Sequence, residues 1–134
     1  MRTSLRRWLA LGVALTLATV LANASPALAS VPYNGVCGDG YNVNNSAAIT
    51  GGTIYLTYNN TNGRNCVVVI RADPGAAMTM DAVLKHSDAT SWRRDPGEWT
   101  TYAGPVYLEA AGRCVDWGGV IGDAWVVRNG TNCG

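Results

Sequence analysis

Four cysteines in a short chain are the feature that most constrains its fold. The chain has 134 residues, and Cys37, Cys66, Cys114 and Cys133 all follow an apolar N-terminal stretch. An even number of cysteines in a short exported protein predicts two disulfides, for which three pairings are possible. We favour Cys37–Cys66 with Cys114–Cys133, because each of these bridges closes a loop within one half of the chain.

The alternative use of the same four side chains is a thiolate metal site. Such sites usually draw their ligands from close Cys-x-x-Cys pairs, and this chain has none. Export also favours oxidised thiols. We therefore predict no metal and no cofactor, and we expect each disulfide to contribute about 3 kcal/mol to stability.

The first 29 residues have the pattern of a secretory signal. Three arginines and no acid precede or border an apolar stretch from Trp8 to Leu21, which is shorter than the roughly 20 residues of a bilayer span. Ala27 and Ala29 supply the small residues that a signal peptidase requires. We predict cleavage after Ala29, which leaves one domain of residues 30–134; an uncleaved anchor is the alternative.

Removal of the signal changes the charge of the protein. Seven of the ten basic residues and all nine acidic residues remain, so the net charge is 7 − 9 = −2, against +1 for the whole chain. A weakly acidic domain gives no electrostatic reason to bind nucleic acid. Arg93 and Arg94 form its only basic pair, so no cationic patch for a membrane is expected either.

Short strands punctuated by turns dominate the rest of the sequence. Residues 53–58 alternate in hydrophobicity, and the turn-forming residues 59–63 end in Asn-Gly, which together predict a hairpin. Residues 66–70 form a β-branched run that we expect to be buried on both faces. Another strand is predicted within residues 40–49, before the hairpin.

Residues 76–84 suit a strand or a helix, since Ala, Met and Leu are good helix formers; we favour a strand, because Met78, Met80, Ala82 and Leu84 alternate. Glycine or proline separates most of the later candidate strands, at residues 98–103, 106–110, 113–117 and 124–128. About eight short strands and no convincing helix predict an all-β fold. It would be a small antiparallel β-sandwich, or a barrel-like domain, with two disulfides.

His86 is the only histidine, and it precedes Ser87 and Asp88. A catalytic triad needs its base in contact with both the nucleophile and an orienting group. Adjacent strand residues point to opposite faces, so we interpret this tripeptide as a polar strand end that enters a loop.

Acidic residues offer only weak candidates for catalysis or metal binding. Two carboxylates could hydrolyse a glycosidic bond, but the sequence places no pair of them at the required separation. We interpret Asp39 and Asp123 as turn residues beside glycines rather than calcium ligands. No catalytic residue is predicted; the acids considered as catalytic pairs are Asp81, Asp88, Asp95, Glu98, Glu109 and Asp116.

Trp and Tyr carry all the aromatic packing, because the chain has no Phe. We assign Trp117 and Trp125 to the core, since valines flank them. Trp92 and Trp99 bracket a polar turn and are expected to be more exposed. They are our candidate ligand-binding aromatics, since exposed indoles stack on sugar rings; the alternative is that they too are core residues.

Six motifs occur in order along the chain: Val36–Tyr41, Thr53–Tyr58, Asn65–Val68, Tyr102–Val106, Cys114–Gly119 and Cys133-Gly134. These motifs resemble the spore-associated protein A family of filamentous actinomycetes. The resemblance covers nearly the whole mature chain and includes all four cysteines. It implies an exported protein found with spores or aerial structures, with no established enzymatic role and no catalytic residues to carry over.

These observations favour a secreted, non-enzymatic protein of the spore or cell surface. Its expected partner is a wall polysaccharide or another surface protein. The alternatives are a small secreted hydrolase that uses dispersed acids or His86, and a secreted inhibitor of another protein.

Overall fold

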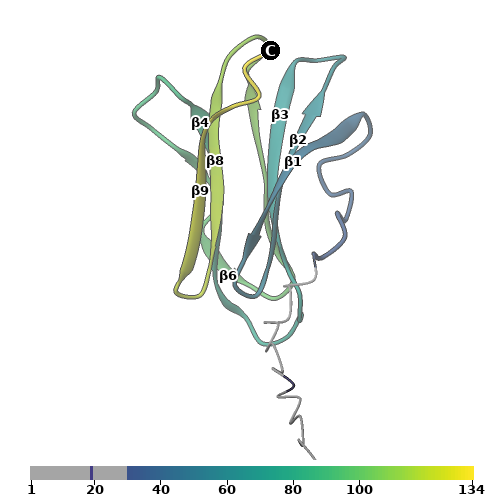
Figure 1. Ribbon diagram of the computed structural model, residues 1–134, viewed down its shortest axis with the longest axis vertical. Helices are drawn as coiled ribbons and strands as arrows, with labels where there is room; N and C mark the ends of the chain where they lie inside the picture. Colours follow the sequence, from purple (N-terminus) through teal and green to yellow (C-terminus); the bar gives the residue numbers. More distant parts are fainter. Residues whose placement is uncertain (1–18, 20–29) are drawn as a thin grey trace, which may run out of the picture.

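The fold consists of two antiparallel sheets that face each other. The computed structural model describes Thr19 and residues 30–134, and these residues form nine strands and no helix (Figure 1). The predicted all-β sandwich is confirmed. The predicted signal peptide lies outside the described residues, apart from Thr19. No helix in the described part of the chain is long and apolar enough to cross a membrane.

The first sheet, which we call sheet A, has the strand order β1-β2-β3-β7. These strands are β1 (Tyr41–Ile49), β2 (Gly52–Asn59), β3 (Arg64–Arg71) and β7 (Tyr102–Glu109). The predicted hairpin is present as β2 and β3, paired from Gly52↔Arg71 to Asn59↔Arg64.

The second sheet, sheet B, has the order β5-β4-β8-β9, and β6 also pairs with β4. Its strands are β4 (Met78–His86), β5 (Arg93–Arg94), β6 (Gly97–Trp99), β8 (Val115–Ile121) and β9 (Ala124–Thr131). Figure 1 shows β4, β8 and β9 on the left and β1, β2 and β3 on the right, with the core between them. The ambiguous segment at 76–84 is therefore a strand, as predicted.

Alternate residues of both sheets build the core. Ile54 and Leu56 of β2 point inward, as the alternation predicted. Trp117 of β8 is fully buried, and its indole Nε1 donates a hydrogen bond to Thr131 Oγ1 at 2.8 Å. Its one polar atom is thus satisfied, and its predicted packing role is confirmed. The inward residues that these side chains meet include Val67, Val69, Met80, Ala82 and Leu84.

Strand β3 is buried on both faces, as predicted. Val67 and Val69 face the core, while Val68 and Ile70 belong to a second apolar cluster on the outer face of sheet A. The segment before β1 covers that cluster, with Val31, Tyr33 and Val36 packed against it. A sheet buried on both faces needs apolar residues at every position, which accounts for the unbroken β-branched run.

A disulfide fixes this covering segment to β3. Cys37 is bridged to Cys66, and Cys114 to Cys133, so both predicted pairings are confirmed. The Tyr107 hydroxyl donates a hydrogen bond to the Cys37 carbonyl at 2.8 Å. The Tyr55 hydroxyl donates another to the Val31 carbonyl.

Two predicted strand breaks at glycine are wrong. Strand β7 continues through Gly104-Pro105, and β8 continues through Gly118 and Gly119. A Cβ atom at Gly119 would lie 2.2 Å from Val69 Cγ2. Here glycine permits close approach of the two sheets rather than a turn. By contrast, Asp39 and Asp123 do lie in turns, as predicted.

The two disulfides should differ in their resistance to reduction. Cys37 and Cys66 are only 3% and 0% exposed, whereas Cys133 is exposed and Cys114 half-buried. Because thiol exchange requires access to sulfur, a water-soluble reductant should open Cys114–Cys133 first in the folded protein. Timed alkylation and peptide mass spectrometry would identify the freed cysteines.

The control is the same reaction in concentrated urea, where the preference should disappear because burial no longer protects either bridge. Alkylation of Cys37 and Cys66 before the other pair in the folded protein would contradict the prediction that burial protects their disulfide.

Candidate functional site

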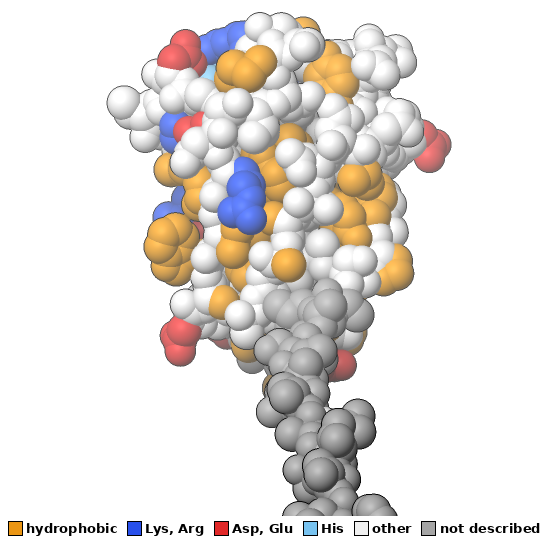
Figure 2. All heavy atoms as spheres, in the orientation of Figure 1, with side chains coloured by type: hydrophobic (Ala, Val, Ile, Leu, Met, Phe, Trp, Pro, Cys, Tyr) orange, Lys and Arg blue, Asp and Glu red, His pale blue; other side chains and the backbone are white. Residues whose placement is uncertain are grey.

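The surface of the protein mixes charged, apolar and uncharged groups. On the face drawn in Figure 2, acidic and basic side chains are interspersed among hydrophobic side chains and the uncharged groups drawn in white. The face has no extended tract of one charge. A ligand site on this face would therefore be formed by a local depression and the side chains that border it.

The outer face of sheet B carries a depression of about 250 Å³ bordered by two indoles, those of Trp92 and Trp125. Val83, Val120 and Val127 provide the apolar part of its lining. We call this region the tryptophan depression.

The strand register explains why these residues meet. Val83 of β4 is opposite Gly118 of β8, and Gly118 is opposite Val127 of β9. Val120 lies in the next outward position and is opposite Trp125. Side chains at alternate positions share one face of a sheet, so the outward valines lie in two neighbouring cross-strand rows, and the row that contains Val120 ends at the indole on the edge strand.

Trp125 is 72% exposed, so its assignment to the core is wrong. It lies on β9, an edge strand whose Val126 packs against the core. Trp125 and Val127 alternate with Val126 and face outward. The alternation of Trp125 with Val126 could have predicted an outward indole. We instead took the valines on both sides as a sign of burial.

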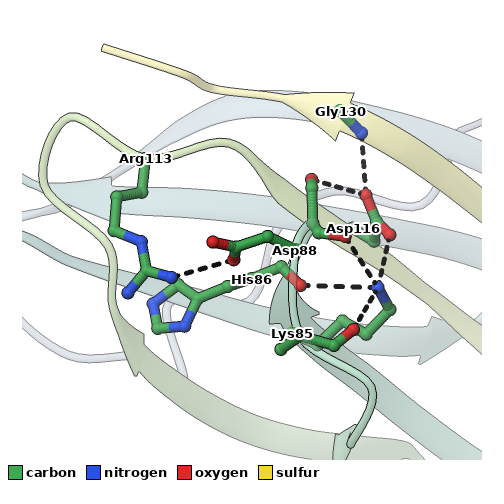
Figure 3. A network of polar contacts seen from close by, with 8 residues as sticks. Lys85, His86, Asp88, Arg113, Asp116 and Gly130 are labelled. Carbon is green, nitrogen blue, oxygen red and sulfur yellow. Dashed lines mark hydrogen bonds and ion pairs between the residues drawn. The ribbon is translucent and has the colours of Figure 1, made fainter.

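Trp92 is half-buried, and one of its neighbours is a lysine side chain. Lys85 Nζ lies 5.2 Å from the centroid of the Trp92 ring, a cation–π distance. The same ammonium group forms an ion pair with Asp116 Oδ2 at 2.8 Å. It also donates to the Ala89 carbonyl at 3.0 Å, with longer contacts to the carbonyls of His86 and Ser87 (Figure 3). Lys85 thus fixes both the loop after β4 and the indole that follows it.

Both carboxylate oxygens of Asp116 have polar partners. Its Oδ1 accepts hydrogen bonds from Ser87 Oγ at 2.7 Å and from the Gly130 backbone N–H at 2.8 Å (Figure 3). Burial raises the pKa of Asp116, but hydrogen bonds from Lys85, Ser87 and Gly130 and the positive charge of Lys85 outweigh it. The net result is a pKa below the ordinary value for aspartate.

An ion pair lines the depression beside the indoles. Arg94 Nε donates to Asp81 Oδ2 at 2.7 Å, and the backbone N–H of Asp95 donates to Asp81 Oδ1 at 3.0 Å. Asp81 is buried, whereas the Arg94 side chain is 55% exposed. The guanidinium group therefore presents donors to the surface while the carboxylate holds it in place.

The structure does not bring Trp92 and Trp99 into one depression. Trp99 lies on β6 and packs against the edge of the core, and its Nε1 donates to the Asp95 carbonyl at 3.2 Å. It lines a separate hollow with Thr100 and Tyr102. Among the aromatic candidates, Trp92 therefore shares its depression with Trp125 instead.

His86, Ser87 and Asp88 do not make the contacts of a triad. His86 Nε2 lies 2.7 Å from the Glu109 carbonyl. Ser87 Oγ donates to Asp116, and Asp88 pairs with Arg113 at 2.9 Å (Figure 3). Strand β4 ends at His86. The interpretation of this tripeptide as a polar strand end that enters a loop is confirmed.

Most of the acids considered as catalytic pairs bind groups of the protein itself. Besides Asp81, Asp88 and Asp116, described above, Asp95 Oδ2 accepts from the Gly104 backbone N–H at 2.7 Å. Glu98 Oε1 accepts from Thr79 Oγ1 at 2.8 Å. Within residues 30–134, no group of three or more His, Cys, Asp or Glu side chains is placed to hold a metal ion.

The Lys85–Asp116 pair should make stability depend on acid pH. A carboxyl group whose pKa is lowered by folding contributes stability that is complete above its unfolded-state pKa, about 4, and that is lost as the pH falls through its folded-state pKa. Asp116→Asn should lower the free energy of unfolding by about 2 kcal/mol at neutral pH, because it leaves the Lys85 ammonium group, whose side chain is only 12% exposed, without its carboxylate partner. Urea unfolding at a series of pH values would measure both effects.

The two proteins should converge only once the pH has fallen below the lowered folded-state pKa of Asp116, because the wild-type carboxyl group is then protonated in the folded protein as well. Asp88→Asn is the matched control: its ion pair with Arg113 is largely exposed and should matter little. An unchanged neutral-pH stability in Asp116→Asn would contradict this account.

Comparison with known proteins gives the family. No family model matches the chain, and no solved structure gives a significant match. A curated protein from Streptomyces coelicolor, named spore-associated protein A, is 45% identical to this chain over 126 residues, which cover 93% of this chain and 82% of the relative. Identity at this level over nearly the whole length places the chain in the spore-associated protein A family.

Proposed function

We propose that this protein is a secreted, non-enzymatic protein of the spore or cell surface that binds wall polysaccharide through the tryptophan depression. The observation that carries the proposal is the exposed indole of Trp125 beside that of Trp92. The two rings border one depression whose remaining lining is apolar and ion-paired.

A sugar ring matches this lining in its chemistry. Its C–H face is apolar and can stack on an indole, while its hydroxyl groups need hydrogen-bond partners at the edge. Trp125 and the three outward valines offer the apolar surface. The exposed guanidinium of Arg94, fixed by Asp81, offers donors to hydroxyl oxygens.

Rigidity of the site also supports binding. Lys85 holds Trp92 from one side, and Asp116 holds Lys85. A prearranged indole loses little conformational entropy when a ligand stacks on it. The non-enzymatic part of the proposal is supported by the contacts of His86, Ser87 and Asp88, which engage other groups of the protein.

The location follows from two separate lines of support. The S. coelicolor relative is named for its association with spores, and we extend that location to this chain. Two disulfides fit an oxidising compartment, as does the signal pattern in the first 29 residues.

The direct test is depletion of the oxidised mature protein, residues 30–134, from solution by washed spore walls, peptidoglycan, chitin or cellulose. Selective depletion by one polymer, lost after reduction and unfolding, is expected. Depletion by none of them would overturn polysaccharide binding. Retention on intact walls but on no isolated polysaccharide would instead indicate a protein partner.

Single substitutions should locate the binding surface. Trp125→Ala should weaken polymer binding by about fivefold or more, since an aromatic stacking contact is worth about 1 kcal/mol, whereas Trp125→Tyr should retain most of it. Val43→Ala is the matched control, because Val43 is also exposed, at 45%, but lies on β1 of the other sheet. Equal binding by Trp125→Ala and Val43→Ala would exclude the tryptophan depression as the site.

A further inference from the structure

Three arginines of this weakly acidic protein gather at one end of the sandwich. Strand β3 begins there with Arg64, while β4 ends there with His86 and β7 with Glu109. These elements of both sheets, with β5 and the loop before β8, enclose a depression of about 380 Å³. Its lining residues are Arg64, His86, Arg93, Leu108, Glu109 and Arg113. We call it the arginine depression.

This clustering stands out against the charge of the domain. Residues 30–134 contain seven Lys or Arg side chains against nine Asp or Glu, yet three of the seven line this one depression. The three arginines are far apart in the sequence, at positions 64, 93 and 113. Only the folded arrangement of the strands brings them together.

Two of the guanidinium groups have no carboxylate partner. Within residues 30–134, neither Arg64 nor Arg93 has an acidic group at ion-pair distance; the ion pairs there join Lys85 to Asp116, Arg94 to Asp81 and Arg113 to Asp88. Arg64 lies over the ring of Tyr107, with its Cζ 4.7 Å from the centroid, and Arg93 is exposed. Their N–H donors remain available to a ligand.

The third arginine can exchange its partner. The pair of Arg113 with Asp88 has side-chain exposures of 48% and 77%, and such exposed pairs contribute little stability. Glu109 also lines the depression, and its negative charge opposes an anion. The balance of charge nevertheless favours a negative ligand, because three arginines and one glutamate line the depression.

His86 links the two sheets by a hydrogen bond from its side chain. A carbonyl oxygen only accepts hydrogen bonds, so at 2.7 Å it is Nε2–H of His86 that donates to the Glu109 carbonyl. His86 and Arg113 both line the depression. The hydrogen bond joins β4 to β7, so the arginines are presented on a rigid frame.

We infer that the arginine depression binds a phosphate group. The planar guanidinium fork matches the oxygens of phosphate and carboxylate. One arginine is enough to bind the two oxygens of a carboxylate, whereas guanidinium groups from three separate elements suit a tetrahedral anion that offers more oxygens. The depression also leaves room for a group attached to that phosphate. This site goes beyond the proposed polysaccharide binding and uses none of its residues.

The test is a titration of the folded protein with inorganic phosphate, followed by amide and arginine side-chain NMR signals, with chloride added to keep the ionic strength constant. Phosphate should shift the signals of Arg64, His86, Arg93 and Arg113 in a saturable way. A shift that does not saturate, or that chloride alone reproduces, would overturn the site, because it would be only screening of surface charge.

Arg93→Gln is the sharpest variant, because this exposed side chain makes no ion pair in the described structure and its loss should not affect folding. Its dissociation constant for phosphate should rise by about fivefold or more, as expected for loss of a charge-assisted hydrogen bond. Arg128→Gln is the matched control: Arg128 is also exposed, but it lies on β9, away from the depression. Equal weakening by both variants would overturn the assignment.

The nature of the ligand is decided by competing anions. Acetate that bound as tightly as phosphate would overturn the phosphate assignment. Dimethyl phosphate that bound at least as tightly as inorganic phosphate would support the site and point to the phosphodiester of a polymer; weaker binding would support it and point to a free phosphate or a monoester. Trp125→Ala should leave all these titrations unchanged, so failure here is separable from failure of polysaccharide binding.

Discussion

The burial of β3 on both faces is the constraint from which the rest of the structure follows. Its inward valines meet sheet B, and its outward residues Val68 and Ile70 lie beneath the segment before β1. That segment is held by the Cys37–Cys66 disulfide. The part of the outer face of sheet A around Val68 and Ile70 is therefore covered by the protein itself. On sheet B the outward valines stay partly exposed and Trp125 is largely exposed, so the surface that we propose for polysaccharide is on that sheet.

Close packing of the two sheets and the shape of the outer face are connected through β8. Gly119 lets Val69 approach the backbone of β8 where any side chain would collide. Its neighbour Gly118 lies between Val83 and Val127 in the register, so the outward row has no side chain at its centre. Two adjacent glycines thus serve two purposes, contact between the sheets on one face and an unfilled position on the other.

Local patterns in the sequence predicted much of the fold, and long-range placement accounts for what they missed. The hairpin and the doubly buried strand were predicted from residues that are close together in the sequence. Both disulfides were predicted from the positions of the cysteines along the chain. Trp125 was misassigned because its neighbouring valines suggest burial, whereas on an edge strand only every second residue is covered. The arginine depression gave no signal, since its arginines come from distant segments and the charge of the whole domain is negative.

The short edge strand β5 separates the two candidate sites. Arg94 contacts Asp81 in the tryptophan depression, while the preceding Arg93 lines the arginine depression. Successive residues of a strand point to opposite faces, so a strand of only two residues contributes one guanidinium group to each site. A polymer that carries both sugar rings and phosphate groups would offer a partner to each depression across this edge. Because the two sites share a strand but no side chain, each can be removed by substitution while the other is kept.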